Sequence, residues 1–585
     1  MESQTKTCQN CKQEFTIESE DFAFYDKIKV PLPTWCPECR MIRRMMFRNQ
    51  RLLFRRKDDV SGKEILASFP QTSLIKVYEH HYWWSDGWDP MDYEREYDFS
   101  RPFFEQFREL LYSVPLFSKS AVNIVNSEYC DQVGWLKNCY LCFDSAYAEN
   151  SSYLVSSLHI QESMDLYQSG QSELCYECVT IHKSYRTFFS RNCVSCNDIW
   201  FSQNLSGCNN CFGCVNIRNK SYYIFNEPYT KEAYVRKLQE YNLGSYRTVE
   251  ELKKKTHELW EKYPVKYMQG FQNMNADGAY IQNSKNVHAS YFVRDSQDIK
   301  YGQIIFERTT DCYDLTNFGI DTAEIYESVT TGLEAYGLKF CWECWKGVQE
   351  VEYSAYCSSS SNLFGCVGLR KKQYCIFNKQ YSEKDFLFLR ANIIKHMDAM
   401  PYLDKKGRVY AYGEFFPPEF SPFAYNETMA QDLFPLAKDE AETKGFPWRD
   451  ADPRKFQMTM QAVDLPDNIK DVADSFLKEV IACALCRKAY RIIPTELDFY
   501  RKIGLPLPQF CPNCRFIERM KLINPPKFWH GRCHCAGSAD DRTMYKNKDL
   551  HFHGESHCSN EFETSYAPGR PEIVYCEQCY QTEVV

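Results

Sequence analysis

The sequence lacks both an excess of positive charge and any long apolar run. Its 585 residues include 70 lysines and arginines against 78 aspartates and glutamates, which gives a net charge of −8. This balance excludes a uniformly basic surface, so any contact with a polyanion must come from a local patch. The polar start MESQTKTCQN has no apolar segment typical of a signal peptide, and no run of about 18 apolar residues follows. We therefore expect a cytoplasmic protein without a membrane partner.

The common signatures of catalysis and nucleotide binding are also missing. No G-x-x-x-x-G-K-[ST], G-x-G-x-x-G, H-E-x-x-H or G-x-S-x-G motif occurs in a supporting context. The apolar content of 44% and the aromatic content of 16% are sufficient for sizeable cores, and the length predicts several domains. A folded protein without enzymatic activity is favoured, although the sequence does not decide against an enzyme.

Cysteine, by contrast, is abundant, with 29 residues. In a reducing compartment cysteine pairs are more often metal ligands than disulfides. Four thiolates in two C-x-x-C pairs give Zn²⁺ a closed tetrahedral shell, so this pattern predicts a structural zinc site. Rubredoxin-like iron and redox thiols are the alternatives. The pattern occurs at both ends of the chain, each time with 24 residues between its two pairs: Cys8, Cys11, Cys36 and Cys39, and Cys483, Cys486, Cys511 and Cys514.

The two ends are copies of one module. Besides the cysteines, they share the segments Phe-Tyr, Lys-Ile and Pro-Leu-Pro and the arginines Arg40 and Arg515 at one constant separation. The pattern C-x-x-C…F-Y-x-K…P-L-P…C-P-x-C-R resembles the zinc-ribbon family of treble-clef type, over about 45 residues at each end. This resemblance implies that the second cysteine pair begins a helix. The whole chain also resembles uncharacterised bacterial proteins that carry such ribbons at both termini, which implies a fold and no activity.

A basic segment follows the first cysteine module. Residues 40–57, RMIRRMMFRNQRLLFRRK, contain eight basic residues and no acidic one, and their spacing predicts an amphipathic helix with an arginine face. Arginine presents a planar fork suited to phosphate, so we predict contact with RNA, the ribosome or DNA. The alternative is a solvated face, or an arginine face docked on an acidic patch of the same chain. The predicted contact residues are Arg40, Arg43, Arg44, Arg48, Arg51, Arg55, Arg56 and Lys57.

A third cysteine cluster lies in the tail, residues 526–585. The C-x-C pair Cys533 and Cys535, combined with the C-x-x-C pair Cys576 and Cys579, would complete another tetrahedral thiolate site, which brings the expected total to about three Zn²⁺ per chain. A zinc ion with histidine ligands and an open coordination position would permit catalysis here. No candidate general base lies at a spacing typical of a catalytic zinc site, so a structural role is favoured. The alternative ligands are Cys558, His551 and His553.

The middle of the chain has a short internal period. The pairs that begin at Cys175, Cys193 and Cys211 follow one another at a constant interval, and the pair at Cys139 lies two such intervals before the first of them. A fixed short period with β-branched and aromatic residues predicts a parallel β-helix with rungs of about 18 residues. Here the cysteines would stack inward as an apolar ladder. The alternative is that adjacent rungs bind zinc or an iron–sulfur cluster.

This middle region is duplicated. The segment FGCVNIRNKSYYIFNEPY at 212–229 recurs as FGCVGLRKKQYCIFNKQY at 364–381, which predicts a second, less regular solenoid. A helical pattern follows each copy, with Thr230 and Ser382 as the expected helix starts, and these helices would cap the solenoid ends.

The predicted fold is a multidomain, mainly β protein in which a duplicated parallel β-helix-like solenoid is flanked by treble-clef zinc ribbons. We expect a non-enzymatic zinc-binding scaffold or adaptor with a nucleic-acid or protein partner, whose oligomeric state the sequence does not decide. The alternatives are a β-helix enzyme acting on a polysaccharide or nucleic acid, and an iron–sulfur or redox protein. The expected units are a ribbon with the basic helix (1–60), an aromatic connector (61–118), a solenoid (119–226), a helical cap (227–270), a second solenoid (271–378), a proline-rich connector (379–480), a second ribbon (481–525) and the tail (526–585).

Overall fold

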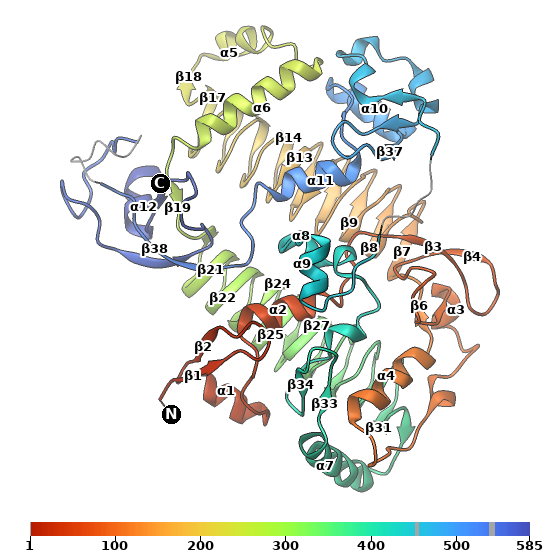
Figure 1. The fold of residues 1–585 in the computed structure, drawn as a ribbon. Coiled ribbons are helices and arrows are strands. Elements are labelled where there is room, and N and C mark those ends of the chain that lie inside the picture. The colour runs from red at the N-terminus through yellow and green to blue at the C-terminus, as the bar shows by residue number, and fades with distance from the viewer. Residues whose placement is uncertain (1, 451–455, 537–544) are drawn as a thin grey trace.

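The computed structural model describes residues 2–450, 456–536 and 545–585. Two β-solenoids of stacked parallel coils lie side by side in its centre, and small modules with helices surround them (Figure 1). The solenoids contact each other directly: the Asn317 side chain donates to the Asp144 carboxylate at 3.1 Å, and Arg294 contacts His182 at 3.2 Å. The predicted architecture of a duplicated solenoid is confirmed.

Each coil of the first solenoid is twelve residues long. Strand β10 pairs in parallel with β12, and Leu158 lies opposite Gly170. Along most of this solenoid the backbone turns a corner at every third residue, where φ is positive, so a coil has four sides of three residues. Such φ values cost a non-glycine residue about 1–2 kcal/mol. Hydrogen bonds between coils offset this cost, as where the Asn192 amide donates to the Val179 carbonyl at 3.1 Å.

The strands of the first solenoid are short because the corners interrupt them. They are β7 (Ala121–Val125), β8 (Asp131–Lys137), β9 (Phe143–Glu149), β10 (Leu158–Gln161), β11 (Met164–Tyr167), β12 (Gly170–Glu173), β13 (Tyr176–Val179), β14 (Tyr185–Phe188), β15 (Asn197–Trp200), β16 (Asn209–Phe212) and β17 (Ser221–Ile224).

Each coil is thus twelve residues long, which is shorter than the rung of about 18 residues that the cysteine spacing predicted. The interval between successive cysteine pairs covers six sides, or one and a half coils, so Cys175 and Cys193 lie on opposite walls of the solenoid. The inward position recurs at every third residue instead. A C-x-x-C pair such as Cys175 and Cys178 therefore fills two successive sides, and both thiols are fully buried.

The interior of the first solenoid combines aliphatic side chains with small serine and cysteine side chains, whose polar atoms bond to the backbone. The Ser157 hydroxyl donates to the Val155 carbonyl and accepts from the Ser169 amide one coil later, at 3.0 and 3.3 Å. The Cys178 thiol donates to the Tyr176 carbonyl at 3.3 Å. Serine and cysteine are interchangeable in this role because each carries one small donor that reaches a local carbonyl.

The second solenoid is wider in part. A coil is thirteen residues long where Gln297 lies opposite Thr310, and twelve where Ser361 lies opposite Gln373. Its strands are β20 (Gly270–Phe271), β21 (Met274–Gln282), β22 (Lys285–Arg294), β23 (Gln297–Lys300), β24 (Gln303–Phe306), β25 (Thr309–Gly319), β26 (Thr322–Ala323), β27 (Tyr326–Gly332), β28 (Tyr336–Lys339), β29 (Gln349–Glu352), β30 (Ser361–Phe364) and β31 (Gln373–Ile376).

A hairpin and a helix close each solenoid at its last coil. β17 pairs with β18 (Glu227–Pro228), and β31 pairs with β32 (Lys379–Gln380). Helices α5 (Lys231–Leu238) and α7 (Glu383–Ala399) then pack on β17 and β31, and α6 (Tyr246–Trp260) follows α5. The predicted starts are confirmed, since the hydroxyls of Thr230 and Ser382 accept from the first-turn amides of α5 and α7.

Each terminal module consists of a small strand pair and two helices. The first contains β1 (Gln4–Thr7), β2 (Glu14–Ile17), α1 (Asp21–Ile28) and α2 (Pro37–Met45). The second contains β36 (Ile481–Ala482), which also pairs with β35 (Met460–Gln461), then β37 (Ala489–Tyr490), α10 (Pro494–Ile503) and α11 (Pro512–Met520). The helix predicted over 40–57 ends at Met45. Residues Phe54–Lys57 form strand β3 instead, because they pair with β4 (Glu64–Ala67).

The connectors are mostly irregular and pack on the solenoids. They contain β5 (Val77–Tyr78), β6 (Leu116–Phe117), α3 (His80–Trp84) and α4 (Phe103–Ser113) before the first solenoid, and β33 (Tyr402–Leu403), β34 (Val409–Tyr410), α8 (Met429–Leu433) and α9 (Lys438–Thr443) after the second. Within the described part of the chain, none of the helices has the length and apolar character needed to cross a membrane.

Candidate metal centres

The first candidate centre joins the four cysteines of the N-terminal module. The Sγ atoms of Cys8, Cys11, Cys36 and Cys39 all lie within 4.8 Å of one another. Cys36 has an extended backbone with φ −65° and ψ 158°, and it is the N-cap of α2, so the second pair begins a helix as the resemblance implied. The Cys36 amide donates to the Cys8 sulfur at 3.2 Å, and the Asn10 side chain donates to the Cys39 sulfur at 3.3 Å.

The second candidate centre repeats this geometry in the C-terminal module. Its ligands Cys483, Cys486, Cys511 and Cys514 also lie within 4.8 Å of one another. The Cys511 amide donates to the Cys483 sulfur at 3.2 Å, the same distance as in the first module. Burial would raise the pKa of Cys483, but the amides of Cys486 and Cys511 outweigh it and lower this pKa to about 7. The thiolate form that a metal requires is therefore accessible near neutral pH.

The third candidate centre lies in the tail and differs from its prediction in one ligand. The structure groups Cys533, Cys576 and Cys579 with Cys558 in place of Cys535. The pairing of β38 (Trp529–Arg532) with β39 (Glu561–Thr564) places Cys558 beside Cys535, to whose carbonyl the Cys558 amide donates at 2.9 Å. The Cys558 sulfur then lies 3.9 Å from the Cys576 sulfur. Cys535 lies in a second group with His551, His553 and Cys579.

The tail centre reproduces the local geometry of the two ribbons. Cys576 is the N-cap of α12 (Glu577–Val584), and its amide donates to the Cys533 sulfur at 3.2 Å. The module is anchored near the start of the second solenoid, because β40 (Val574–Tyr575) pairs with β19 (Val265–Lys266). Hydrogen bonding from Cys533, together with the amide of Cys579, lowers the pKa of Cys576 to about 4 against the effect of burial.

Donor type and spacing at these three centres suit a tetrahedral, thiophilic ion such as zinc. Each set offers four cysteine sulfurs, and four thiolates crowded together in a partly buried site repel one another unless a cation neutralises them. The amide donors stabilise individual thiolates but carry no net charge, so all four cysteines of a set can ionise together only beside a cation, and each set could hold one metal ion.

The arginines of α2 face inward and bind the second solenoid. Arg40 Nη2 lies 2.8 Å from Asp314, and Arg43 Nη2 lies 2.8 Å from Glu327. All three of Arg40, Arg43 and Arg44 are at most 1% exposed. Arg43 also pairs with Glu414 at 2.9 Å. Figure 1 shows α2 lying across β25 and β27, the strands that carry Asp314 and Glu327.

The second module makes the corresponding contact with the first solenoid. Arg515 and Arg519 of α11 lie 2.9 and 2.7 Å from the fully buried Asp165. The two solenoids end in the matching segments 212–229 and 364–381. Counting back the same number of coils from each segment, along the paired strands, leads to Asp165 in the first solenoid and to Asp314 in the second, so the two aspartates occupy equivalent positions. Arg515 is likewise the counterpart of Arg40. Each ribbon helix thus docks through the same arginine–aspartate pair, but the N-terminal ribbon docks on the second solenoid and the C-terminal ribbon on the first.

Most of the arginines that were predicted to contact nucleic acid are buried in the structure. Arg40, Arg43, Arg44 and Arg48 are buried against carboxylates of the same chain, so their guanidinium groups present no free fork to a phosphate. This is the alternative in which an arginine face docks on an acidic patch. Arg51 is partly buried against Asp432, Arg56 is buried beside Asp59, and Arg55 and Lys57 are exposed.

Among the residues that the structure describes, no ligand group includes a solenoid cysteine. The four groups of three or more ligating side chains found among the described residues contain only cysteines and histidines of the terminal modules. The solenoid thiols donate to backbone carbonyls instead, as Cys344 does to Ser354 and Cys366 does to Cys375, at 3.4 and 3.3 Å. Their arrangement is that of a packed interior ladder.

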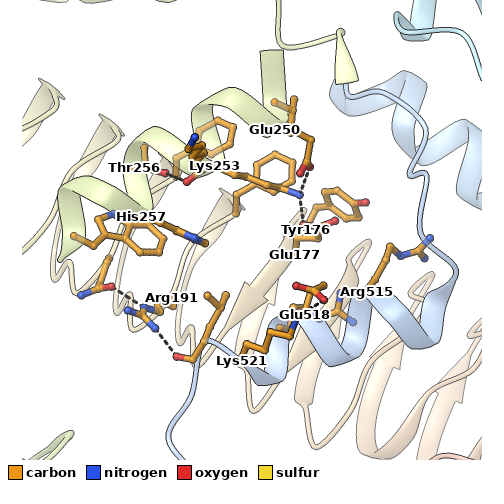
Figure 2. Close-up of a pocket in the computed structure, with 18 of the residues that line it drawn as sticks. Tyr176, Glu177, Arg191, Glu250, Lys253, Thr256, His257, Arg515, Glu518 and Lys521 are labelled. Carbon is orange, nitrogen blue, oxygen red and sulfur yellow. Dashed lines mark hydrogen bonds and ion pairs between the residues drawn. The ribbon is translucent and has the colours of Figure 1, made fainter. Parts of the chain in front are cut away.

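A cavity of about 620 Å³ lies between α6, α11 and the first solenoid (Figure 2). Lys253 extends from α6 into it and pairs with Glu177 and Glu250 at 2.7 and 3.0 Å. Burial and the nearby Arg191 lower the pKa of His257 to about 4, so this imidazole is neutral at pH 7. Sequence reasoning missed the cavity because its walls come from segments that are far apart in the chain.

A second, much smaller cavity contains two carboxylates. Asp131 and Glu343 line a space of about 10 Å³. Burial raises the pKa of both, that of Glu343 to about 8. Such a volume accommodates about one water molecule, so it cannot admit a polymer substrate. These two carboxyl groups with raised pKa values therefore line a space far smaller than a polymer-binding groove.

Comparisons with known proteins yield little. No family model matches the chain, and no curated protein matches it. Among solved structures, a crystal structure described as a "putative acetyltransferase" from Desulfovibrio desulfuricans G20 aligns with 50% of this chain and 86% of its own, at 8% sequence identity and a TM-score of 0.10.

Proposed function

We propose that the protein is a non-enzymatic, zinc-dependent scaffold in which metal-folded modules clamp two solenoids into one body. The crossed docking of the ribbon helices carries this proposal. Arg40 and Asp314 are 274 residues apart, so the N-terminal module ties the start of the chain to its second half. A module of about 45 residues has a small core, and a structural metal is the usual means of holding such a unit rigid.

Zinc is the proposed ion because the three tetrathiolate sets match its preferred shell. A closed shell of four protein ligands leaves no position for water or substrate, so these centres support folding rather than chemistry. The buried carboxylates that face the ribbon helices support the same conclusion, because the ribbon arginines pair with them. The smaller cavity beside Glu343 is too small for the polymer substrate of the alternative enzyme hypothesis.

Contact with RNA, the ribosome or DNA through residues 40–57 is a separate proposal that rests on fewer residues. Arg55 and Lys57 are exposed on β3, and Arg55 already pairs with Glu64 at 2.9 Å. The test is retention on RNA and on DNA as a function of salt for the parent protein and for an Arg55→Gln, Lys57→Gln variant. Retention that falls with salt and weakens in the variant supports this contact, whereas retention unchanged by the variant removes it.

The scaffold proposal is tested by elemental analysis and native mass spectrometry of protein purified without oxygen. We expect at least three zinc ions per chain, colourless protein, and loss of thermal stability on chelation. As a control, Cys341→Ser and Cys344→Ser in the second solenoid should retain all the zinc. Iron or a brown colour would instead favour the iron–sulfur or redox hypothesis, and zinc loss in that control would show that the solenoid cysteines bind zinc.

A further inference from the structure

The tail contains two ligand groups that share one sulfur. Cys533, Cys558 and Cys576 form the first group with Cys579, and Cys535, His551 and His553 form the second group with the same Cys579. Within each group the ligand atoms all lie within 4.8 Å of one another. A thiolate has several lone pairs and can bind two cations at once, so the shared sulfur does not force a choice between the groups.

The hydrogen bonds of the two histidines orient their free nitrogens toward the second group. His553 Nδ1 lies 2.6 Å from the Ser556 carbonyl oxygen, which can only accept, so this nitrogen carries the proton. His553 Nε2 is then the unprotonated nitrogen, and it lies 3.3 Å from the Cys579 sulfur. A metal-binding histidine usually donates its other N–H in this way to a carbonyl or a carboxylate.

His551 is held in the same way, except that its Nε2 contacts the hydrogen-bond acceptor and its Nδ1 faces the sulfur. Its Nε2 lies 3.2 Å from the Glu583 carboxylate, and its Nδ1 lies 3.4 Å from the Cys535 sulfur. The side chains of His551 and Glu583 are 1% and 0% exposed. The Asn547 side chain also donates to the Cys535 sulfur at 3.1 Å, which stabilises a thiolate there. Both histidines therefore present a lone pair to the same space as two sulfurs.

The charge of the combined cluster favours two cations over one. With one divalent ion, five thiolates would leave a net charge of −3 around a buried site. With two divalent ions the same five thiolates and two neutral imidazoles carry −1, which is less than the −2 of a single tetrathiolate zinc site. Sharing Cys579 reduces the number of buried negative charges for each ion.

We propose that the tail holds a binuclear centre in which two zinc ions are bridged by the Cys579 thiolate. One ion has four sulfur ligands, and the other is bound by Cys535, Cys579, His551 Nδ1 and His553 Nε2. Both shells are closed, so the centre is structural. The inference rests on the proposed function in taking the cysteine clusters to bind zinc, and it raises the total from three ions to four.

The first test counts ions in the full-length protein by native mass spectrometry with elemental analysis. We expect four zinc ions per chain, and three in the His551→Gln, His553→Gln variant. His530→Gln is the matched control, because this exposed histidine of the same module pairs with Glu561 and Glu563 and belongs to neither ligand group. It should retain four ions.

The outcomes separate the two proposals. Three ions in the parent protein, with no loss in the His551→Gln, His553→Gln variant, would overturn the binuclear centre and leave the zinc scaffold standing. Fewer than three ions in the parent would overturn both.

A second measurement requires no variant. In protein loaded with ¹¹³Cd, the bridging sulfur should couple two of the four cadmium resonances to each other, and one of the coupled pair should show the shift of a mixed sulfur and nitrogen shell. Four resonances without coupling, or three resonances in all, would exclude the bridge.

Discussion

The same C-x-x-C motif has different roles at the ends of the chain and in its solenoids. In the two ribbon modules a second pair follows the first after one strand and one helix, and its first backbone amide donates to a sulfur of the first pair, as from Cys511 to Cys483. In the solenoids the two cysteines of a pair, such as Cys175 and Cys178, occupy successive inward sides and donate to backbone carbonyls. The motif specifies two neighbouring sulfurs, and the topology around it decides whether four sulfurs converge.

The most direct test of this difference removes one cysteine pair from a terminal module and one cysteine pair from a solenoid. Replacing Cys36 and Cys39 by serine should release one zinc ion and unfold the N-terminal module, because zinc binding contributes about 10 kcal/mol or more to the folding of such units. Elemental analysis and limited proteolysis measure the two effects. The same replacement of Cys341 and Cys344 should leave the zinc count unchanged. Equal zinc loss in both variants would show that the regions are not distinct.

The second prediction concerns the buried arginines, whose positive charges neutralise carboxylates of the solenoids. Arg43→Met leaves the buried Glu414 without its arginine partner, while Glu327 keeps Arg44 at 3.3 Å, and removing one member of a buried ion pair costs about 3–5 kcal/mol. Arg55→Met is the matched control, since its exposed pair with Glu64 is worth about 1 kcal/mol or less. Chemical denaturation measures both, and the zinc content should stay constant. A loss in Arg43→Met as small as in the control would mean that this arginine does not hold the module to the solenoid.

The third prediction is that the stability of the terminal modules and the stability of the second solenoid change with pH in opposite directions. Acid should weaken the terminal modules, because protonated thiols release zinc. Glu343 in the second solenoid behaves oppositely. Its pKa is raised to about 8 in the folded protein, so the folded state binds more protons than the unfolded state between about pH 4.5 and pH 8, and stability falls as pH rises through this window.

The Glu343→Gln variant should therefore stabilise the protein, by on the order of 2 kcal/mol more at pH 9 than at pH 6. Thermal denaturation at the two pH values measures this difference. Glu334→Gln, an exposed position of the same solenoid, should shift stability equally at both. A pH-independent effect of Glu343→Gln would mean that this carboxyl is already ionised in the folded state.

How much of this could be predicted depends on whether the information is local. The eight ribbon cysteines were found because the ligand type and the spacing lie within one short segment at each end. The exchange of Cys535 for Cys558 depends on the register of a hairpin, which the sequence does not state. The partners of the α2 arginines were not predictable either, because Arg40 and Asp314 are 274 residues apart and Arg43 and Glu327 are 284 residues apart.

The three-residue side of each coil was available in the sequence, but the spacing of the cysteine pairs obscured it. Small residues recur at many of the every-third positions in the segment from Ser127 to Cys214, and serine alternates with aliphatic residues at several positions between the cysteine pairs. The cysteine interval is itself a multiple of three, so a period judged from cysteine alone still gave a consistent lattice. A count that treated serine and cysteine as equivalent small inward residues would have found the shorter repeat.

That equivalence leads to the last and smallest effect. Cys175 lies between Ser163 and Thr187 in one column of the solenoid, and its amide already donates to the Ser163 hydroxyl at 2.9 Å. In Cys175→Ser the new hydroxyl can donate to the Glu173 carbonyl, as the thiol does, so we expect a change of about 1 kcal/mol or less and full zinc retention. Urea denaturation with zinc analysis measures both. Cys175→Leu is the contrasting variant, because the added volume must overpack the interior, at a cost of about 1–3 kcal/mol. If serine were as damaging as leucine, the thiol would have a specific role beyond that of a small inward donor.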